Sequence, residues 1–536
     1  MVVCLSIWGC GGSGPNELVC LAAAGGSPGA VQAPVLRMTL PGSWDENWFA
    51  SPVVADIDHD GKNEIVAARH SVLAVWNADG TLRWKTAWAH SASNTPEHGN
   101  SRMWASPVVG NFNDDPYLEI AVGSDADSVD NVNVAVYDYR GELMPNWPKR
   151  FGSGPFEVRS IAAGDLDKDG LAEIVVSKTG NGSNGPLTNV YRLDGSVMPG
   201  WPQINHATCD PAKPAEPCWE AGAYNQNIGV GDVDGDGYLD VISTYDAIGF
   251  GVFDRNGKPF PTNPVFTADR VITSCEAYED FTLAKQGWGN GDRTEFTYSP
   301  PVIADINGDG KMEYILAGDH ESTQSTANQG VTFWALNADM TRPVGWERPK
   351  NSGKPLFYGT VGNNIVSNPP SPSVGNIDAA PGLEFLAPSY DGNFYAFGSA
   401  GTLLWKYSFA IQASPYKGAS EALIADLNGD GIPEILFNTY SSGAPGKPDT
   451  PAHLIVLNNK GVELQKVALS GRGSMAPPTL ADLDGDGQLE LIISLKDALG
   501  SGKGGVQVWD TPNASPNCLI WPTGRGNYMR QGWVKP

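Results

Sequence analysis

One acidic pattern recurs eight times along the sequence, and it constrains the fold more than any other feature. The pattern reads D-x-[DN]-x-D-G-x-x-[DE], and its first copy is DIDHDGKNE, residues 56–64. The eight copies begin at residues 56, 111, 165, 232, 305, 376, 426 and 482, so the period runs from 50 to 73 residues. Repeats of this length indicate one repeating fold in place of the several domains that 536 residues would otherwise suggest.

Each copy lies between two short segments of β-strand character. The first is preceded by SPVVADI and followed by EIVAA, then by an aromatic strand, LAVWN, a tight turn, NADG, and a fourth segment. With 64 Gly and 41 Pro, the chain has many turns and few long helices. We therefore predict an all-β fold, a β-propeller of eight four-stranded blades, with seven blades as the alternative and an acidic loop between the first and second strands of each blade.

Tryptophan recurs in the fourth segment of the repeat. At one position per blade, a Trp is expected to be a large apolar wedge between neighbouring sheets rather than a surface on which a ligand stacks. The residues concerned are Trp84, Trp147, Trp201, Trp346, Trp405 and Trp521.

The spacing within the first loop suits a metal ion. When such a loop curls, the side chains at its odd-numbered positions converge, Gly61 permits the sharp turn, and the carbonyl oxygen of Lys62 completes an oxygen cage of the kind that calcium takes. A helix-loop-helix calcium hand needs its last acid at position twelve, where Ala67 stands, so that alternative is rejected. Crowded carboxylates repel, and a divalent ion reverses that cost; magnesium demands a stricter geometry than calcium. The acids of this loop are Asp56, Asp58, Asp60 and Glu64.

This nine-residue pattern between two strands resembles the FG-GAP and VCBS repeats of integrin α-chain-like propellers, over residues 51–510. The resemblance implies calcium as the cofactor, about six ions, in the six loops that keep the whole pattern. Beyond the first loop, the implied side-chain ligands are Asp165, Asp167, Asp169, Glu173; Asp232, Asp234, Asp236, Asp240; Asp305, Asn307, Asp309, Glu313; Asp426, Asn428, Asp430, Glu434; and Asp482, Asp484, Asp486, Glu490. The corresponding backbone carbonyls at position seven belong to Leu171, Tyr238, Lys311, Ile432 and Gln488.

Two loops depart from the pattern. The second keeps oxygen-bearing side chains but has Pro116 in place of the glycine, so we expect weak calcium binding there; its residues are Asn111, Asn113, Asp115 and Glu119. The sixth has Ala380 in place of its third acid, so we expect little or no binding; its residues are Asn376, Asp378 and Glu384.

The N-terminal segment and the cysteines bear on the cellular compartment. Residues 1–42 are predicted to be a signal-like, lipoprotein-like or disordered segment, and residues 43–536 the propeller. The stretch IWGCGGSG resembles a bacterial lipoprotein cleavage box, which would make Cys10 the acylated residue. Cys209 and Cys218 bracket a Pro-rich loop that a local disulfide could close. Together these features favour an extracytoplasmic protein, either secreted or a lipoprotein of the cell surface or outer membrane.

Charge and loop lengths bear on the partners. The formal net charge is −25 and Lys or Arg runs are absent from the sequence, which excludes nucleic acid as a partner, and the sequence lacks an apolar run long enough for a transmembrane segment. In a four-stranded meander the long blade-to-blade insertions lie on the face opposite the acidic loops, so we expect a carbohydrate or protein ligand there, and a monomeric protein. Candidate aromatic contacts, which could equally well anchor their own loops, are Trp88, Trp104, Trp219, Tyr224, Trp288 and Tyr298.

Catalytic motifs are not evident. The sequence contains neither G-x-S-x-G nor H-E-x-x-H. Calcium-rich eight-bladed rhamnogalacturonan lyases resemble it in blade number and acidic loops, but their KWDP-like strand is absent; quinone-dependent dehydrogenases resemble it in hairpins such as AVWNADGTLRWK but lack the acidic loops. We therefore predict a binding or adhesion module, with a polysaccharide-active enzyme as the alternative. The C-terminal WPTGRGNYMRQG is predicted to close the ring by pairing near VLRMTLPG.

Overall fold

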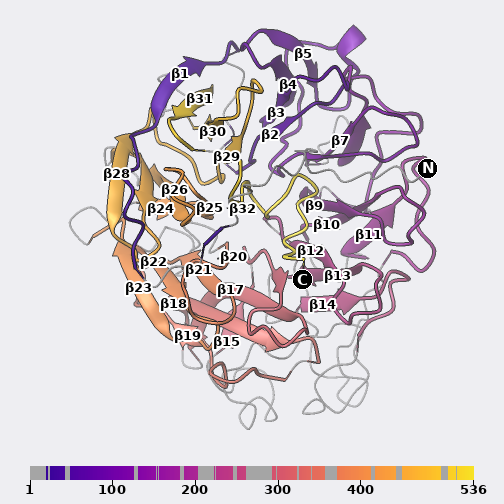
Figure 1. The fold of residues 1–536 in the computed structure, drawn as a ribbon. Coiled ribbons are helices and arrows are strands. Elements are labelled where there is room, and N and C mark those ends of the chain that lie inside the picture. The colour runs from indigo at the N-terminus through magenta and orange to yellow at the C-terminus, as the bar shows by residue number, and fades with distance from the viewer. Residues whose placement is uncertain are drawn as a thin grey trace, which may run out of the picture.

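The computed structural model describes residues 20–535, except 22–24, 43–46, 48, 126–130, 153, 155, 181–185, 203–221, 224, 246–249, 261–292, 297, 323–324, 340, 357–370, 412–416, 442–449, 497–504 and 515. These residues form eight antiparallel sheets arranged as a ring about a central axis (Figure 1). A 3₁₀ turn, η1 (Ala92–Asn94), is the one helical element that they contain. None of the described helices is long and apolar enough to cross a membrane. The predicted all-β propeller of eight blades is confirmed.

Blades 1 to 4 follow one another along the chain. Blade 1 contains β2 (Val53–Ala55), β3 (Glu64–Arg69), β4 (Val72–Asn77) and β5 (Leu82–Ala87). Blade 2 contains β6 (Val108–Gly110), β7 (Glu119–Gly123) and β8 (Val134–Tyr137), and blade 3 contains β9 (Val158–Gly164), β10 (Glu173–Lys178) and β11 (Thr188–Tyr191). Blade 4 contains β12 (Ile228–Gly231), β13 (Asp240–Thr244) and β14 (Phe250–Phe253).

Blades 5 to 8 complete the ring. Blade 5 contains β15 (Arg293–Glu295), β16 (Val302–Ala304), β17 (Glu313–Ser322), β18 (Ser325–Asn337) and β19 (Lys350–Asn351). Blade 6 contains β20 (Ser373–Gly375), β21 (Glu384–Pro388), β22 (Asn393–Phe397) and β23 (Leu403–Ser408). Blade 7 contains β24 (Lys417–Ala419), β25 (Leu423–Ala425), β26 (Glu434–Ser441), β27 (His453–Leu457), β28 (Glu463–Ala468) and β32 (Leu519–Trp521). Blade 8 contains β29 (Thr479–Ala481), β30 (Leu489–Leu495), β31 (Gly505–Thr511) and, from the N-terminal part of the chain, β1 (Val35–Thr39).

The fourth strand is reduced to isolated bridges in blades 2, 3 and 4. The bridges are Val134 to Lys149 and Tyr137 to Leu143 in blade 2, Tyr191 to Val197 in blade 3, and Phe253 to Pro259 in blade 4. The corresponding sequences, GELMPNWPKR, GSVMPGWPQ and GKPFP, are rich in proline. Proline has no backbone N–H to donate and cannot continue a ladder, so the outer edge of these blades stays irregular.

The ring is closed by the N-terminal strand. β1 pairs antiparallel with β31, in the register Val35 to Asp510 and Thr39 to Gln507, and it lies on the outer edge of blade 8 (Figure 1). The propeller therefore begins before residue 43. The prediction that the C-terminal segment pairs near VLRMTLPG is wrong, because β31 is the neighbour of that strand and the C-terminal segment lies elsewhere.

Residues 518–534, which we call the tail, run along the axis of the ring. After β32 pairs with β25, the tail accepts hydrogen bonds from backbone N–H groups of the innermost strands: those of Leu480, Val109, Ala163, Val230 and Ile303 donate, in that order, to Pro522, Tyr528, Met529, Gln531 and Gly532 at 2.8–3.1 Å. In blade 1, the Arg530 guanidinium donates to the carbonyls of Ser51 and Pro52. The C-terminal end accordingly lies near the centre of the ring (Figure 1).

The residue before each acidic loop makes room for the tail. It is glycine in blades 2, 3, 4 and 6 and alanine in the other four. A Cβ at Gly110 would lie 2.3 Å from Met529 Cε, one at Gly231 would lie 2.8 Å from Trp533 Cγ, and one at Gly375 would lie 2.6 Å from Ile520 Cγ2. At these three positions glycine therefore leaves room for a tail side chain, whereas a Cβ at Gly164 would first meet Leu239 and Val230 of blade 4.

The interpretation of the repeated tryptophans as wedges between blades is confirmed for five of the six. The indole Nε1 of each donates to a backbone carbonyl in the next blade, at 2.6–3.0 Å: Trp84 to Tyr139, Trp147 to Leu193, Trp201 to Arg255, Trp346 to Ser399 and Trp405 to Asn459. Trp521 differs, since it lies in β32 at the axis and donates to Glu421 Oε1 at 2.6 Å.

Candidate metal centres

Every acidic loop directly follows an innermost strand, and its position-nine acid is the first residue of the second strand of the blade, or in blade 8 the second residue. In all eight blades this buried carboxylate accepts a hydrogen bond, at 2.7–3.1 Å, from the backbone N–H at position two. The contact closes the loop on itself and leaves the second carboxylate oxygen to face the other side chains. The acids concerned are Glu64, Glu119, Glu173, Asp240, Glu313, Glu384, Glu434 and Glu490.

The remaining acids hold the six complete loops in a curled conformation. The position-one carboxylate accepts the N–H of the glycine at position six, as Asp56 does from Gly61 at 2.8 Å. The position-five carboxylate accepts the N–H of position seven, as Asp60 does from Lys62 at 2.9 Å. Both contacts recur in loops three, four, five, seven and eight. Gly61 has a φ of +87°, a backbone conformation that glycine adopts without strain.

Four loops bring three carboxylates together. At positions one, three and nine, the oxygens of each group lie within 4.8 Å of one another; the groups are Asp56, Asp58, Glu64; Asp165, Asp167, Glu173; Asp232, Asp234, Asp240; and Asp482, Asp484, Glu490. The position-five acids lie outside these groups. Asp58 Oδ1, Asp165 Oδ1 and Asp167 Oδ1 are buried and have no hydrogen-bond donor among the described residues. Buried oxygens without donors, packed beside like charges, are the chemistry that a divalent cation satisfies.

The position-nine acids carry raised pKa values. Burial, which disfavours the ionised carboxylate, raises the pKa of the seven glutamates to about 7, and the neighbouring acids contribute. The pKa of Asp240 is raised to about 8, first by burial and then by Asp234, Asp236 and Asp232. A bound cation would favour the ionised forms, so ion binding and proton release are linked at these loops.

Arginines contact three of the four carboxylate groups. Arg83 from β5 donates to Glu64 Oε1 at 2.9 Å and to Asp58. Arg192 donates to Asp167 Oδ2 at 2.6 Å. Arg37 from β1 donates to Asp484 Oδ2 and to Glu490 Oε1, both at 2.8 Å. The sequence patterns did not single out these arginines, because Arg83 and Arg37 lie in other strands and Arg192 directly follows β11, so that only folding brings them to the loops.

The carboxylate group of blade 4 has no such arginine. Among the described residues, neither Lys nor Arg forms an ion pair with Asp232, Asp234 or Asp240. This loop therefore concentrates three acids without a compensating side chain, and it has the most to gain from a cation.

In loops five and seven, asparagine stands at position three. The amide nitrogen of Asn307 donates to Glu313 Oε1 and that of Asn428 donates to Glu434 Oε1, both at 3.0 Å. To serve as a ligand, each amide would turn its Oδ1 toward the ion.

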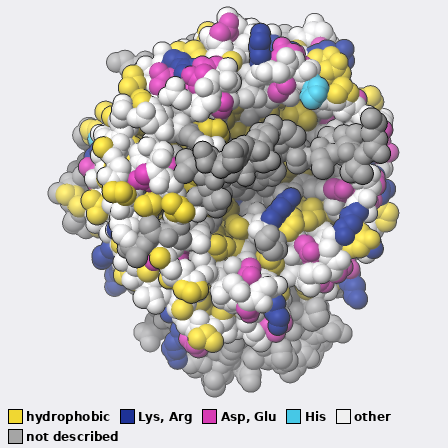
Figure 2. All heavy atoms as spheres, viewed as in Figure 1, with side chains coloured by type: hydrophobic (Ala, Val, Ile, Leu, Met, Phe, Trp, Pro, Cys, Tyr) yellow, Lys and Arg dark blue, Asp and Glu magenta, His cyan; other side chains and the backbone are white. Residues whose placement is uncertain are grey.

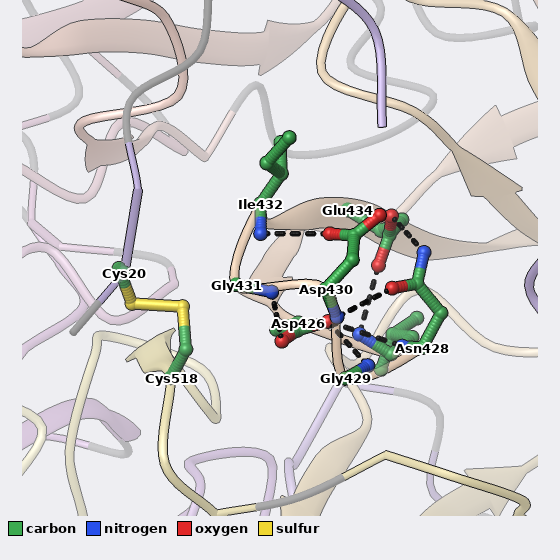
Figure 3. The surroundings of a disulfide bond; sticks show 10 residues. Cys20, Asp426, Asn428, Gly429, Asp430, Gly431, Ile432, Glu434 and Cys518 are labelled. Carbon is green, nitrogen blue, oxygen red and sulfur yellow. Dashed lines mark hydrogen bonds between the residues drawn. A yellow bond between two sulfur atoms is a disulfide. The ribbon is translucent and has the colours of Figure 1, made fainter. Parts of the chain in front are cut away.

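The N-terminal segment covers loop seven. Leu21 N–H donates to the carbonyl of Gly431 at 2.6 Å, and Ser27 Oγ donates to Asp430 Oδ2 at 2.7 Å. Beside this loop, Cys20 forms a disulfide with Cys518 of the tail, with Cα atoms 5.1 Å apart (Figure 3). The two ends of the propeller are thus covalently joined at one blade. Cys10, Cys209 and Cys218 lie outside the described residues, so the lipidation and the disulfide predicted for them stay predictions.

The two departing loops keep part of this framework. In loop two, Asn111 Nδ2 donates to the carbonyl of Asp115 at 3.1 Å, while Asn113 Nδ2 donates to Glu119 Oε1 at 2.7 Å. In loop six, Asp378 Oδ1 accepts the N–H of Ala380 at 2.6 Å, and Glu384 Oε1 is buried with no donor among the described residues. The position-nine contact survives in both, so it does not depend on a complete ligand set.

Of the candidate aromatic contacts, three are described. Trp88 is fully buried in the core of blades 1 and 2, so its ring is not at the surface. Trp104 and Tyr298 are partly exposed. Trp219, Tyr224 and Trp288 lie outside the described residues.

Trp104 belongs to a cluster on the face opposite the acidic loops. Its ring meets Phe49 edge-on, with centroids 5.6 Å apart, and the guanidinium carbons of Arg102 and Arg159 lie 5.9 and 5.7 Å from its centroid. Phe49 and the two arginines were not among the predicted contacts. The arrangement joins aromatic and basic groups from blades 1, 2 and 3. On the face of the protein drawn in Figure 2, basic and acidic side chains are scattered and form no large patch of one sign.

The ring of eight sheets, with an acidic loop after each innermost strand, defines a repeat β-propeller with candidate metal loops. The FG-GAP-like repeat family matches residues 426–493, from the seventh loop through most of β30. The chain is thus an eight-bladed β-propeller that contains an FG-GAP-like repeat.

Comparison with known proteins gives distant relatives. Over 316 residues the chain is 24% identical to the rhamnogalacturonan endolyase YesW of Bacillus subtilis (strain 168), covering 53% of this chain and 48% of that enzyme, so it spans about half the length of the curated relative it matches. Among solved structures, the Bacillus licheniformis rhamnogalacturonan lyase PL11 is 16% identical, with a TM-score of 0.46, covering 93% of this chain and 79% of that one. The V. cholerae biofilm matrix protein Bap1 is 13% identical, with a TM-score of 0.36, covering 97% and 96%.

Proposed function

We propose that this protein is a calcium-binding propeller that acts outside the cytoplasm as a binding module for a carbohydrate or protein ligand. About six calcium ions would lie in loops one, three, four, five, seven and eight, held by the acids and asparagines at positions one, three, five and nine and by the carbonyl at position seven. The observation that supports this most strongly is the convergence of three carboxylates in each of four loops. In loops one and three, the buried oxygens Asp58 Oδ1, Asp165 Oδ1 and Asp167 Oδ1 also have no donor among the described residues. The ions would act as structural clips that fix each inner strand to the next.

The ligand is proposed to bind on the opposite face, at the cluster of Phe49, Trp104, Arg102 and Arg159. Flat aromatic rings bind sugar faces or apolar side chains, and the neighbouring guanidiniums add attraction for carboxylates. Arg159 also forms an ion pair with Glu157. On a chain with a net charge of −25, the exposed Arg102 beside the partly exposed indole therefore favours an anionic ligand, such as an acidic polysaccharide.

A second candidate function is that of a polysaccharide-active enzyme. The observation that favours it is the 24% identity to a rhamnogalacturonan endolyase. A lyase would cleave an acidic polysaccharide and leave an unsaturated sugar at the new end, whereas a binding module would retain the polymer unchanged.

The calcium proposal is tested by melting. Ions that bind only the folded state raise Tm by mass action, so the wild-type protein should melt at a clearly higher temperature in calcium than in chelator. Titration calorimetry on the chelated protein should give a stoichiometry near six. Equal melting curves in calcium and in chelator would refute the proposal.

The ligand proposal is tested on immobilised glycans in calcium, together with an ultraviolet assay for unsaturated products from pectic polysaccharides. Trp104→Ala should abolish binding. The matched control is Tyr139→Ala, which removes an aromatic ring that Arg140 covers at 5.4 Å, but in a hairpin on the acidic-loop side. Binding without product supports the module, product formation supports the enzyme, and equal loss in both variants would contradict the assignment of the face.

The extracytoplasmic location is supported by the disulfide between Cys20 and Cys518, since such bonds persist in oxidising compartments. If Cys10 is acylated, nine residues lie between it and Cys20, and the chain from one cysteine to the other can reach at most roughly 35 Å. The acidic-loop side of blade 7 would then face the membrane and the opposite face would be free for ligand. Mass spectrometry of peptides from the membrane fraction tests the acylation of Cys10 and a bond between Cys209 and Cys218.

A further inference from the structure

A small cavity lies on the axis of the ring, at the ends of the inner strands opposite the acidic loops. Its volume is about 20 Å³, and the residues that line it include Ser51, Gln226, Glu421 and Arg525. Those residues come from blades 1, 4 and 7 and from the tail. A cavity of this size holds one particle the size of a water molecule or a halide ion, and it is too small for a sugar.

Arg525 offers unused donors to this cavity. Its side chain is 2% exposed, and its Nη2 donates to the carbonyls of Ile228, at 3.3 Å, and Pro301. Its Nε and Nη1 have no hydrogen-bond acceptor among the described residues, and the same holds for Gln226 Nε2 and Ser51 Oγ in the same cavity. Four buried donors without acceptors therefore belong to three residues that line one small space.

The charges around the cavity do not cancel. Arg530 directs its three guanidinium nitrogens at carbonyls and at the hydroxyl of Thr523, so its hydrogen bonds are satisfied but its charge is not. Glu421 Oε1 accepts from Trp521 Nε1 and from the backbone N–H of Arg525, at 2.6 and 2.7 Å. Two guanidiniums thus face one carboxylate, and the excess positive charge is buried.

The protonation states keep that excess at neutral pH. Burial lowers the pKa of Arg525 and of Arg530 to about 10, so both stay charged. Burial also raises the pKa of Glu421, and a neutral Glu421 would leave a larger positive excess. Burying an uncompensated charge is costly, and a counter-ion removes that cost.

We propose that the axial cavity binds one small monovalent anion of the halide class, held by the Nε and Nη1 of Arg525, by Gln226 Nε2 and by Ser51 Oγ. A water molecule would accept hydrogen bonds from some of these donors but would leave the charge uncompensated, whereas a halide satisfies both. The ion joins the tail to blades 1 and 4, so it strengthens the closure of the axis. The site is distinct from the acidic loops and does not depend on the proposed ligand.

The first test is the melting temperature of the wild-type protein at constant ionic strength and constant calcium, with sodium chloride or bromide against sodium methanesulfonate, whose anion is too large for the cavity. The expected result is a higher and saturable Tm in the halides. An equal Tm in chloride, bromide and methanesulfonate would overturn the proposal. So would an equal increase in Tm when sodium sulfate replaces the halide, because that increase would be a general salt effect.

Variants assign the effect to the cavity. Gln226→Ala with Ser51→Ala leaves the tail intact and should weaken halide affinity by about tenfold. Arg525→Met should abolish the halide dependence. The matched control is Arg530→Met, which removes a buried arginine whose guanidinium donates to backbone carbonyls and to Thr523. This variant should have a lower Tm than the wild-type protein, but its Tm should still rise with halide concentration. A halide affinity that is unchanged in the double variant would overturn the assignment.

A direct readout is the anomalous diffraction of crystals grown in bromide. A peak within hydrogen-bond distance of Arg525 Nε or Nη1 supports the proposal. An ordered water at that position, with no anomalous signal, refutes it.

Discussion

Replacing the position-nine acid of blade 4 by its amide should have opposite effects with and without calcium. Asp240 is 2% exposed, and its Oδ2 accepts the N–H of Val233 at 2.9 Å. Asparagine keeps a carbonyl oxygen for that hydrogen bond and removes an acid that must take up a proton when the protein folds without calcium. Asp240→Asn should therefore stabilise the protein in chelator, and destabilise it in calcium by removing a carboxylate ligand.

The magnitude follows from the pKa of Asp240, which burial and the neighbouring acids raise from 3.8 to about 8. At pH 7 the folded protein holds a proton that the unfolded chain has released, which costs on the order of 4 kcal/mol at about 1.4 kcal/mol per pKa unit. Solvent screening and relaxation of the loop reduce this to about 1–2 kcal/mol. For a propeller of this size, that corresponds to a rise in Tm of about 1–2 °C in chelator.

The assay is differential scanning calorimetry of the wild-type and Asp240→Asn proteins, in calcium and in chelator. The matched control is Glu384→Gln in blade 6, where Ala380 leaves the ligand set incomplete; its effect on Tm should be the same in both buffers. If Asp240→Asn lowers Tm equally in calcium and in chelator, position nine is purely a structural contact and the reasoning from metal binding is refuted.

Three further predictions rest on other contacts. In chelator, the Tm of the wild-type protein should fall as pH rises from about 5 to about 8, because the folded protein binds more protons at its position-nine acids than the unfolded chain does. Calcium should make Tm less dependent on pH. A Tm in chelator that does not change with pH would contradict this prediction. Arg83→Gln should raise the calcium affinity of loop one, measured by terbium luminescence, because Arg83 competes with the ion for two carboxylates, whereas Arg140→Gln, on an exposed arginine that contacts Asp138, should leave it unchanged. Trp405→Phe should lower the free energy of unfolding by about 1 kcal/mol, because it removes one interblade hydrogen bond. Gly461→Ala should lower it by more, because Gly461 has a φ of +76° and a Cβ there would lie 2.6 Å from the Trp405 ring. If urea unfolding shows the larger loss for Trp405→Phe, this packing is ruled out.

The local parts of this fold could be predicted from the sequence. The acidic loops and their flanking strands lie within about a dozen consecutive residues, so spacing alone indicates which oxygens converge. The wedge role of Trp84 and its equivalents was also accessible, because a residue that recurs once per blade meets the same neighbour each time.

What could not be predicted depends on contacts between distant parts of the chain. The spacing of loop one gives no sign that Arg83 would reach Glu64, and nothing near Cys20 indicates a bond to Cys518. The alternation of glycine and alanine before the loops was visible, but its meaning required the position of the tail. The pairing of β1 with β31 likewise depends on which segment reaches the outer edge of blade 8, and both ends of the chain were possible.

The placement of the tail has a consequence for biosynthesis. The residues that fill the axis, from Leu519 onward, are translated after all eight acidic loops, and they contact inner strands that were made earlier. Until these residues leave the ribosome, the blades lack their axial contacts and Cys20 lacks the cysteine with which it pairs. A chain cut before residue 518 would keep all eight acidic loops and the pairing of β1 with β31, but it would lose the hydrogen bonds along the axis and the disulfide.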